Sequence, residues 1–483
     1  MKQGSKDTLM TSKIQAIFKI IVIFWISISL VRPVFTQIKK IKPKIIEKRG
    51  LIEKTYEGEG NINEEAKELF LKGYNFFQEE EYGKAITVLE KAIQIDPNFT
   101  EAYTNLGNIY DELGSHQKAL KLYHKAIQID PNFAVAYNNI GIVYYNLEQF
   151  QKAIGFYKKS IKLDPNSVEA YNNLAIVYGK LGDYQKEIDY LEKAIQINPN
   201  FAEAYNNIGV TYIELDNPRQ ALSYLQEAIQ LDPNDSDAYN NLGIAHRKIA
   251  NYHESIMCGQ KAIQLDPNSV EAYNNLAIVY GKLGDYQKEI DYLEKAIQIN
   301  PNFAGTYYNL ADAYIHLSNY QEAITHLKKA IEINPDVVKV NYNLAVVYEE
   351  IGKYKEAIIY FKKVIDADPK HIDALTYLAS VYIKLGDYQE ALIYAKKAYH
   401  IDSNDVAVYL ALGSAYGGLG DYINAKKYYQ KAREICEQLG NQRCVDLTKN
   451  MEAMMESRLE KLGQDAIFYL RAPPSLESDQ DMP

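Results

Sequence analysis

A proline recurs every 34 residues along most of this 483-residue chain, and no other feature restricts the fold as strongly. The series runs from Pro97 to Pro369, and Ser403 occupies the next expected place. A fixed period of this size indicates stacked supersecondary units, because a single unit of that length cannot bury its apolar face alone. Eleven repeats fit between Ala66 and Leu439: residues 66–99, 100–133, 134–167, 168–201, 202–235, 236–269, 270–303, 304–337, 338–371, 372–405 and 406–439.

Each repeat has the residue pattern of two helices joined by a turn. Positions 4, 7, 8 and 11 are apolar or small and share one helical face. In the third repeat these are Tyr137, Ile140, Gly141 and Tyr144. Position 8 is Gly or Ala in all eleven repeats, which lets a second helix, with its own face at positions 20, 24 and 27, approach closely. The residue before each proline avoids helical geometry, so the unit ends there. The sequence predicts an all-α solenoid of helix–turn–helix repeats.

One stretch of 40 residues occurs twice without a difference, from Leu163 to Ala202 and from Leu265 to Ala304. The two copies are three periods apart. Repeats in a solenoid contact only their neighbours, so a block of three repeats can be inserted without creating a new kind of interface. The identity indicates a recent in-frame duplication or exchange, and we favour this interpretation over two matched binding sites.

The repeat as a whole resembles the tetratricopeptide repeat. The pattern is a large aromatic residue, Leu-Gly or Leu-Ala, a Tyr, then Ala, an aromatic residue or Leu, and finally Pro. This chain has Tyr where that pattern prefers Trp, as at Tyr103 and Tyr137. The resemblance implies a right-handed superhelix whose first helices line a concave groove. The Asn-rich first helices look similar to those of the O-linked N-acetylglucosamine transferases, but only 44 residues follow Leu439, too few for a catalytic domain.

Position 6 is Asn in eight consecutive repeats. The resemblance implies that such a row holds the backbone of a bound peptide, since an amide offers two donors and an acceptor. The alternative is that the row belongs to the repeat consensus and links neighbouring helices. The candidate peptide-binding residues are Asn105, Asn139, Asn173, Asn207, Asn241, Asn275, Asn309 and Asn343.

The charge of the chain is divided unevenly. The net charge is −10, yet residues 1–50 carry eleven Lys or Arg against Asp7 and Glu47, so the other 433 residues sum to −19. An acidic solenoid argues against nucleic acid as a partner. Position 2 of the first helix is often acidic, which favours basic segments in a ligand, although Lys residues at position 13 oppose this. The basic block Lys39–Arg49 fits either contact with anionic lipid or a solvated linker.

The two ends of the chain lie outside the repeats. Residues 1–36 contain a Lys-flanked apolar run, Ile20–Val31, and are predicted to be a signal peptide or an N-terminal membrane anchor. Residues 37–62 are predicted to be a basic flexible linker before a solenoid spanning 63–439. Residues 440–462 are predicted to form a capping helix and residues 463–483 a disordered tail. An exported or envelope location follows, with a cytoplasmic location as the alternative.

The residues that commonly carry chemistry do not form a known site. There is no Gly-rich phosphate loop, and the eight histidines have no metal-ligand spacing. The sequence therefore predicts no enzyme activity, no cofactor and no metal. Cys436 and Cys444 flank a turn and could pair if the protein is exported, and two free thiols are the alternative. Glu187 and Glu289 stand where most repeats have Ala, and we expect them to tilt outward to water.

Because these features argue against an enzyme or a nucleic-acid-binding protein, we predict that the chain recognises other proteins. We predict a scaffold or adaptor that binds extended peptide segments of protein partners, with association to a membrane through the N-terminus and self-association as further expectations. Two alternatives remain open. One is a regulatory subunit, itself without catalytic activity, of a glycosyltransferase or an envelope assembly complex. The other is a self-assembling structural protein.

Overall fold

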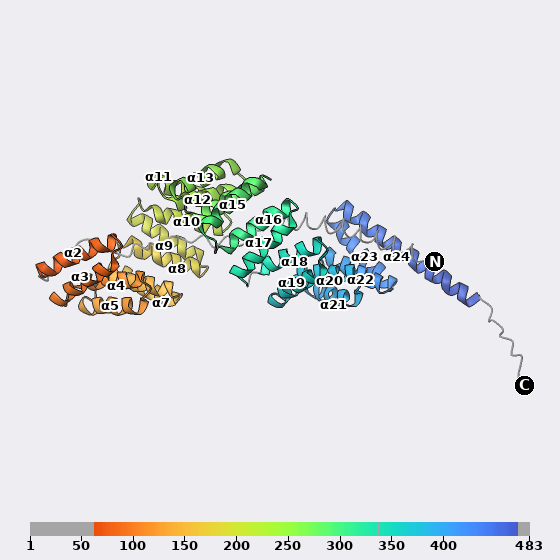
Figure 1. The fold of residues 1–483 in the computed structure, drawn as a ribbon, viewed down its shortest axis with the longest axis horizontal. Helices are drawn as coiled ribbons and strands as arrows, with labels where there is room; N and C mark the ends of the chain where they lie inside the picture. Colours follow the sequence, from red (N-terminus) through yellow and green to blue (C-terminus); the bar gives the residue numbers. More distant parts are fainter. Residues whose placement is uncertain (1–61, 336–337, 472–483) are drawn as a thin grey trace, which may run out of the picture. The chain divides into compact units, whose positions relative to one another are not determined.

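The computed structural model describes residues 62–335 and 338–471, with side chains described as far as Leu462 (Figure 1). Within these ranges the chain forms 23 helices and no strand. The predicted all-α class and the helix–turn–helix array are confirmed. The segments predicted as signal or anchor and as linker lie outside the described residues, except for Ile62, and so do residues 472–483.

The described chain divides into two compact units, each a run of paired helices. The N-terminal unit comprises residues 62–285. Its helices are α2 Glu64–Gln78, α3 Tyr82–Ile95, α4 Thr100–Glu112, α5 His116–Ile129, α6 Ala134–Asn146, α7 Phe150–Leu163, α8 Val168–Lys180, α9 Tyr184–Ile197, α10 Ala202–Glu214, α11 Pro218–Leu231, α12 Ser236–Lys248, α13 Tyr252–Leu265 and α14 Val270–Lys282.

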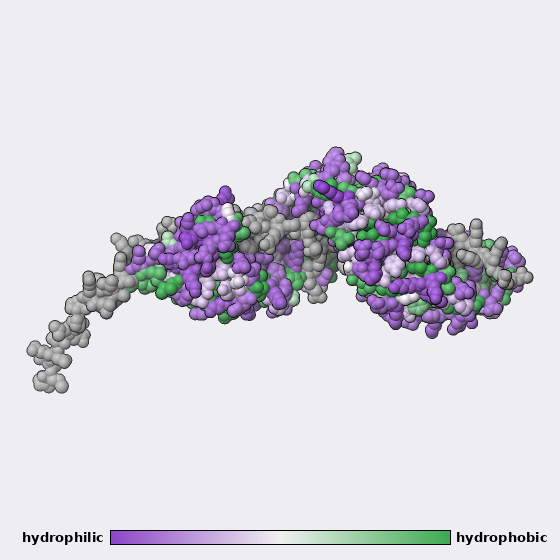
Figure 2. Space-filling view, turned by 180° about the vertical axis from the view of Figure 1, so that it is seen from behind, coloured by the Kyte–Doolittle hydropathy of each residue, from purple (hydrophilic) through white to green (hydrophobic). Residues whose placement is uncertain are grey.

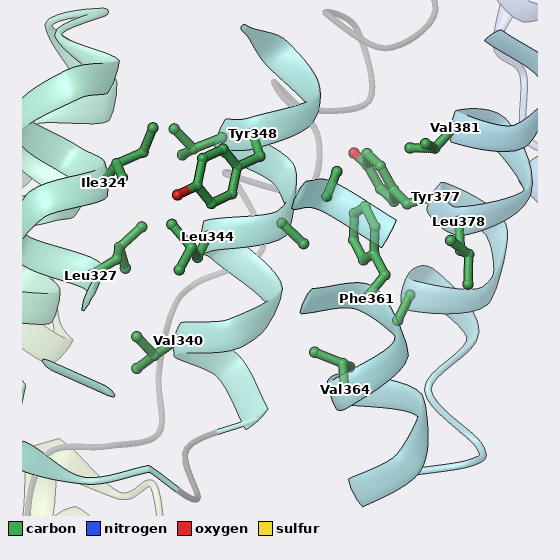
Figure 3. Packing of buried hydrophobic residues seen from close by; sticks show 14 of the residues in the cluster. Ile324, Leu327, Val340, Leu344, Tyr348, Phe361, Val364, Tyr377, Leu378 and Val381 are labelled. Carbon is green, nitrogen blue, oxygen red and sulfur yellow. The ribbon is translucent and has the colours of Figure 1, made fainter. Parts of the chain in front are cut away.

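The C-terminal unit comprises the described residues from Tyr286 onward. In its core, side chains from successive repeats interdigitate; Figure 3 shows Leu327, Leu344 and Leu378, from three of these repeats. Its helices are α15 Tyr286–Ile299, α16 Ala304–His316, α17 Tyr320–Ile333, α18 Val338–Glu350, α19 Tyr354–Ala367, α20 Ile372–Leu385, α21 Tyr388–Ile401, α22 Val406–Gly418, α23 Tyr422–Gln438 and α24 Gln442–Arg471.

The two helices of one repeat are in closest contact at positions 8 and 24. In the second repeat, a Cβ atom added to Gly107 would lie 2.6 Å from the ring of Tyr123. The same clash, at 2.5 Å, would occur between Gly141 and Tyr157 in the third. Leu at position 24 gives the same close approach opposite Gly209, at 2.5 Å, although the fourth repeat accommodates Ala175 opposite Leu191. A small residue at position 8 is therefore a packing requirement of the close contact between the two helices.

The turns explain both the recurring glycine and the recurring proline. After the first helix the chain takes a left-handed residue, such as Gly182 with φ of 80°. At the end of the second helix, Asp164 is held extended by the following proline. Its side chain accepts a hydrogen bond from the backbone N–H of Asn166 at 3.0 Å, which closes the turn. Five repeats take the left-handed conformation without glycine, at Glu80, Glu148, Asp216, Ala250 and Ser318.

Many of the 42 tyrosines of the chain belong to stacks of aromatic rings, and such a stack recurs within successive repeats. In the fourth repeat the ring of Tyr190 lies between those of Tyr171 and Tyr178, with centroids 6.3 and 5.5 Å away. Lys158 of the preceding repeat reaches over Tyr178, with Nζ 5.8 Å from the ring centroid. The rings therefore join the two helices of a repeat, and the lysine joins adjacent repeats. Equivalent stacks are Tyr137–Phe156–Tyr144, Tyr205–Tyr224–Tyr212, Tyr307–His326–Tyr314 and Tyr409–Tyr428–Tyr416.

Two glutamates at position 20 differ from expectation. We expected Glu187 and Glu289 to tilt outward to water, but they are buried, with exposed fractions of 4% and 6%. The reason is the residue at position 12. A Cβ atom on Gly179 would clash with a carboxylate oxygen of Glu187, so the carboxyl group fills the space that a glycine leaves. Gly281 precedes Glu289 at the same spacing. In these two repeats, Gly at position 12 and Glu at position 20 therefore occur as a pair, where most other repeats have a larger residue at position 12 and Ala at position 20.

The C-terminal end of the array is covered by α24. Val445, Met451 and Met455 are buried, and the two methionines pack in one cluster with residues of α22 and α23. The helix was expected to end at Leu462 but continues to Arg471. A disulfide between Cys436 and Cys444, with Cα atoms 5.7 Å apart, joins α23 to the first turn of α24.

The buried carboxyl group generates a testable pH dependence. Burial raises the pKa of Glu187 to about 8, a hydrogen bond with Thr211 opposes this rise, and the charge of Glu214 adds to it while that of Lys180 lowers it. The unfolded chain releases this proton near the ordinary glutamate pKa of 4.5. The folded state therefore holds more protons between these values, and its stability falls as pH rises across this window, by about 3–5 kcal/mol in total.

The substitution Glu187→Gln keeps the size of the side chain and its hydrogen-bonding capacity but does not titrate. We expect it to remove most of this fall in the free energy of unfolding, measured by urea titration at about pH 5, 6.5 and 8. Glu192→Gln, on an exposed position of the same helix, is the control and should leave the fall unchanged. A Glu187→Gln chain that keeps the wild-type pH slope would show that the buried carboxyl group is charged in the folded state.

Candidate functional site

In the N-terminal unit, the candidate residues at position 6 donate hydrogen bonds to side chains of the preceding repeat. Asn173 donates from Nδ2 to Oδ1 of Asn138 at 3.3 Å, and Asn207 donates to Asn172 at 2.9 Å. In each case the acceptor is the position 5 residue of the preceding repeat. The same bond joins Asn241 to Asn206 at 2.9 Å and Asn275 to Asn240 at 3.0 Å. We call this row of paired amides the asparagine ladder.

The ladder changes its acceptor at the second repeat and in the C-terminal unit. Asn139 donates to Asn108 at 2.8 Å, and the hydroxyl of Tyr123 donates to the same oxygen at 2.7 Å. In the C-terminal unit Asn343 donates to the hydroxyl of Tyr308 at 3.0 Å. The two remaining candidates are Asn105, which is buried, and Asn309, which is half-buried.

These bonds give the candidate residues a structural role, which was the alternative in the sequence prediction. Sequence reasoning missed the acceptors at position 5. The signal was visible, because Asn-Asn pairs recur at 138–139, 172–173, 206–207, 240–241 and 274–275. Binding of a peptide by the row stays a prediction.

The ladder uses only part of the hydrogen-bonding capacity of its amides. Each amide has an oxygen and an NH2 group, and one of these forms each ladder bond. Within the described residues, Oδ1 of Asn139, Oδ1 of Asn173 and Nδ2 of Asn172 are buried without a hydrogen-bond partner. Buried polar groups without a partner are rare and destabilising by about 1–3 kcal/mol each. The three atoms are thus hydrogen-bonding groups that the described residues leave without a partner.

Some of the lysines on the first helices form ion pairs with acids of the array. Two of the position 13 lysines pair within the array: Lys248 with Asp216 at 2.7 Å, and Lys384 with Glu349, which is buried. These lysines were expected to oppose the attraction of the groove for basic ligands, and pairing reduces their effect. The face of the molecule seen in Figure 2 is mostly hydrophilic, with apolar residues in small separate patches. This face therefore suits polar recognition better than apolar docking.

In the described part of the chain, no cluster of three or more His, Cys, Asp or Glu side chains is placed so that it could hold a metal ion. His116, for example, contacts Asp111 through Nδ1 at 2.5 Å, without a third such side chain to complete a site. These residues offer structural polar contacts rather than a metal centre.

A double-mutant cycle on one ladder bond tests its structural role. We expect Asn207→Ala to lower the free energy of unfolding by about 1–3 kcal/mol, because it leaves the buried Oδ1 of Asn172 unpaired. Removing both amides should be less harmful than the sum of the single changes, with a coupling energy of about 0.5–1.5 kcal/mol. Asn146→Ala, at an exposed helix end, is the control. Strictly additive effects in urea unfolding would mean that the bond contributes nothing.

Comparison with known proteins identifies the repeats. Family models described as tetratricopeptide repeat match residues 132–200, 234–302, 302–370, 100–133, 202–235, 352–393 and 406–439, and one described as TPR repeat matches residues 73–114. No curated protein matches the chain.

Three solved structures contain a chain similar to this one. YrrB, described as a TPR protein with an unusual peptide-binding site, is 27% identical over 37% of this chain and 92% of its own, with a TM-score of 0.31. The APC/C hetero-tetramer Cut9–Hcn1 is 15% identical over 80% of this chain and 96% of its own, with a TM-score of 0.43. Yeast Tom70 is 14% identical over 84% and 99%, with a TM-score of 0.41.

The family models cover the repeats almost from end to end, and the structure gives each repeat the same pair of helices. This chain belongs to the tetratricopeptide repeat family.

Proposed function

We propose that this chain is a scaffold that binds extended peptide segments of other proteins along the face formed by the first helices of successive repeats. Arrays of this family are generally scaffolds without catalytic activity, and the described residues contain no catalytic domain. The observation that carries the proposal is the set of three buried, unpaired amide atoms on Asn139, Asn172 and Asn173. Two are acceptors and one is a donor.

An extended peptide supplies the missing partners. Its N–H groups match the two unpaired oxygens, and its C=O groups match the unpaired Nδ2. Because every residue except proline carries both groups, this recognition tolerates many side-chain sequences. The amides are also held in place before a ligand arrives, since each of the three residues uses its other amide atom in a ladder bond. Binding then requires little ordering of the protein.

Peptide binding can be separated from the ladder by the substitution Asn172→Asp. An aspartate keeps an oxygen that accepts from Asn207 but has no Nδ2, so the ladder bond stays and the free donor is lost. We expect peptides selected from a displayed random 12-residue library to bind the wild-type chain and to bind the Asn172→Asp chain about tenfold more weakly, which corresponds to one lost hydrogen bond. Fluorescence anisotropy measures both affinities.

Two controls make this measurement specific. Asn198→Asp adds the same charge at a turn where other repeats have Asp and should not change the affinity. Selected peptides with N-methylated backbone positions should bind poorly, because they lack the N–H donors. Full binding of the N-methylated peptides, or full binding by the Asn172→Asp chain, would exclude the proposed recognition of the main chain.

We also propose that the protein is exported or associated with a membrane. The support is the Lys-flanked apolar run Ile20–Val31, which lies outside the described residues. No helix of the described chain has the length and apolar character needed to cross a bilayer. Residues 1–40 fused to a reporter that is active only outside the cytoplasm should give signal. A fusion found wholly in the cytoplasm, without a membrane fraction, would contradict this location.

The similarity of the Asn-rich first helices to those of the transferase arrays remains a proposal, and we infer no specific partner from it. The array binds proteins or peptides by the same groups in either setting. A role beside a glycosyltransferase would add a partner and would leave the peptide-binding face unchanged.

A further inference from the structure

Two neighbouring second helices of the N-terminal unit, α5 and α7, carry lysines and no acidic residue. Their sequences are HQKALKLYHKAIQI and FQKAIGFYKKSIKL. Lysine at position 26 belongs to the repeat pattern, since ten of the eleven repeats have it. The absence of acids does not, because every other second helix in the described residues has at least one Asp or Glu. The seven lysines, all exposed, are Lys118, Lys121, Lys125, Lys152, Lys158, Lys159 and Lys162.

The seven lysines share one surface, which we call the lysine face. Successive residues of an α-helix are about 100° apart, so the lysines of each helix lie within an arc of roughly 120°. The opposite arc packs into the core, through Tyr123 on α5 and Tyr157 on α7. The two helices are neighbours, because the ring centroid of His124 on α5 lies 6.4 Å from that of Phe156 on α7 (Figure 1).

The array does not neutralise the charge of the lysine face. None of the seven lysines forms an ion pair with another described residue. Four lie over tyrosine rings, with Nζ 4.8–5.8 Å from the ring centroid, and keep their positive charge there. Residues 113–168 contain three acids, all in turns, so this segment carries 7 − 3 = +4 in a chain of net charge −10.

The arrangement fits a flat anionic surface. The lysines of α7 extend about 15 Å along the helix axis, and those of α5 lie beside them, so the charge is spread in two dimensions. Neither helix exposes a large apolar side chain, so attraction by charge is what this face offers. Both helices also lack Arg in their central and final turns, the residue that holds phosphate or carboxylate groups of a specific partner in bidentate pairs. Lysine, a point charge on a flexible stem, suits the many headgroups of an anionic bilayer.

We propose that the lysine face binds the surface of an anionic lipid bilayer and holds the array against it. Each lysine close to such a surface strengthens binding about fivefold. Salt at about 0.15 M screens charges beyond about 8 Å, so the acids in distant repeats do not cancel this attraction. The binding requires neither insertion of an apolar segment nor a bound peptide. Because the asparagine ladder lies on the first helices, a bilayer against these second helices leaves the ladder accessible.

A fluorescent label on the lysine face tests the contact in the full chain. Gly155 lies among the lysines of α7, and a Cβ atom added there meets no heavy atom within 4 Å, so Gly155→Cys accommodates a nitrobenzoxadiazole label. Ser223→Cys, at the same position of the repeat on α11, is the control. Both chains carry Cys258→Ala, which removes the free thiol of the described residues.

The probe is a phosphatidylcholine vesicle with about 30% phosphatidylserine and a small share of lipid that is spin-labelled at its headgroup. We expect the vesicles to quench the label at position 155 at least threefold more than the label at position 223. Quenching at position 155 should fall as salt is raised from about 0.05 to 0.5 M. Equal quenching at the two positions, or none at position 155, overturns the proposal.

Charge variants make the test specific. The substitutions Lys121→Gln, Lys125→Gln and Lys162→Gln remove three lysines that form no ion pair or ring contact within the described residues. We expect them to weaken vesicle binding at least tenfold, since each lysine contributes about fivefold. Arg at the same three positions keeps the charge and should keep the binding, which separates loss of charge from loss of the fold. Full binding by the Lys→Gln chain overturns the proposal.

A matched triple tests whether the position of the lysines matters. Lys193→Gln, Lys355→Gln and Lys427→Gln remove three exposed lysines from second helices that also carry acids. Vesicle binding by this chain should change less than about twofold. A loss equal to that of the first triple would show that only net charge matters, and would overturn the lysine face as a site.

Two further probes distinguish the bilayer from other occupants. Vesicles of phosphatidylcholine alone should not quench position 155 more than position 223, and strong quenching of position 155 by them would overturn an electrostatic contact. A peptide of eight glutamates represents an acidic protein segment. If it binds the wild-type chain in a way that the Lys→Gln triple abolishes, while phosphatidylserine vesicles leave position 155 unquenched, the occupant is an acidic protein and the proposal is wrong.

Discussion

Close contact between the two helices of each repeat is the interaction on which the rest of the structure depends. At positions 8 and 24 the helices approach so closely that Gly107 and Gly141 have no room for a Cβ atom beside the tyrosine rings opposite them. Each such pair buries one face and leaves another, which only the next repeat can cover. The stacked rings then strengthen the contact within a repeat, and the lysines over them join successive repeats. Stability in the array is accordingly the sum of contacts between neighbours.

In the asparagine ladder, one half of an amide links adjacent first helices, as Asn207 does with Asn172. The other half has no partner within the described residues in some of these side chains, as for Oδ1 of Asn173, and this half is the one that we propose binds a peptide. The two roles that the sequence presented as alternatives are therefore compatible. A substitution that removes the whole side chain tests both at once, whereas an isosteric change such as Asn172→Asp separates them.

The regular features could be predicted from sequence because they depend on residues close together in the chain. Proline and aspartate set the turns, and the period placed the first helices at their observed starts in every repeat but the first, where α2 begins at Glu64 rather than Ala66. Features that depend on packing between helices were missed. The ladder bonds join residues 35 positions apart, and Glu187 is buried only because Gly179 leaves space for it. Position 20 considered alone gave the wrong answer, since the fit belongs to the pair. The extra turns of α24 beyond Leu462 follow no apolar pattern that predicts them.

The central claim, that each repeat contacts only its neighbours, is tested most directly by deleting residues 164–265. In the shortened chain Asp266 follows Leu163, as Asp164 does now, and the duplicated sequence recreates each interface. The account predicts a folded protein whose circular dichroism signal at 222 nm per residue equals that of the parent, with a modest loss of stability from the fewer neighbour contacts. Loss of the helical signal, or recovery of aggregates only, would contradict it.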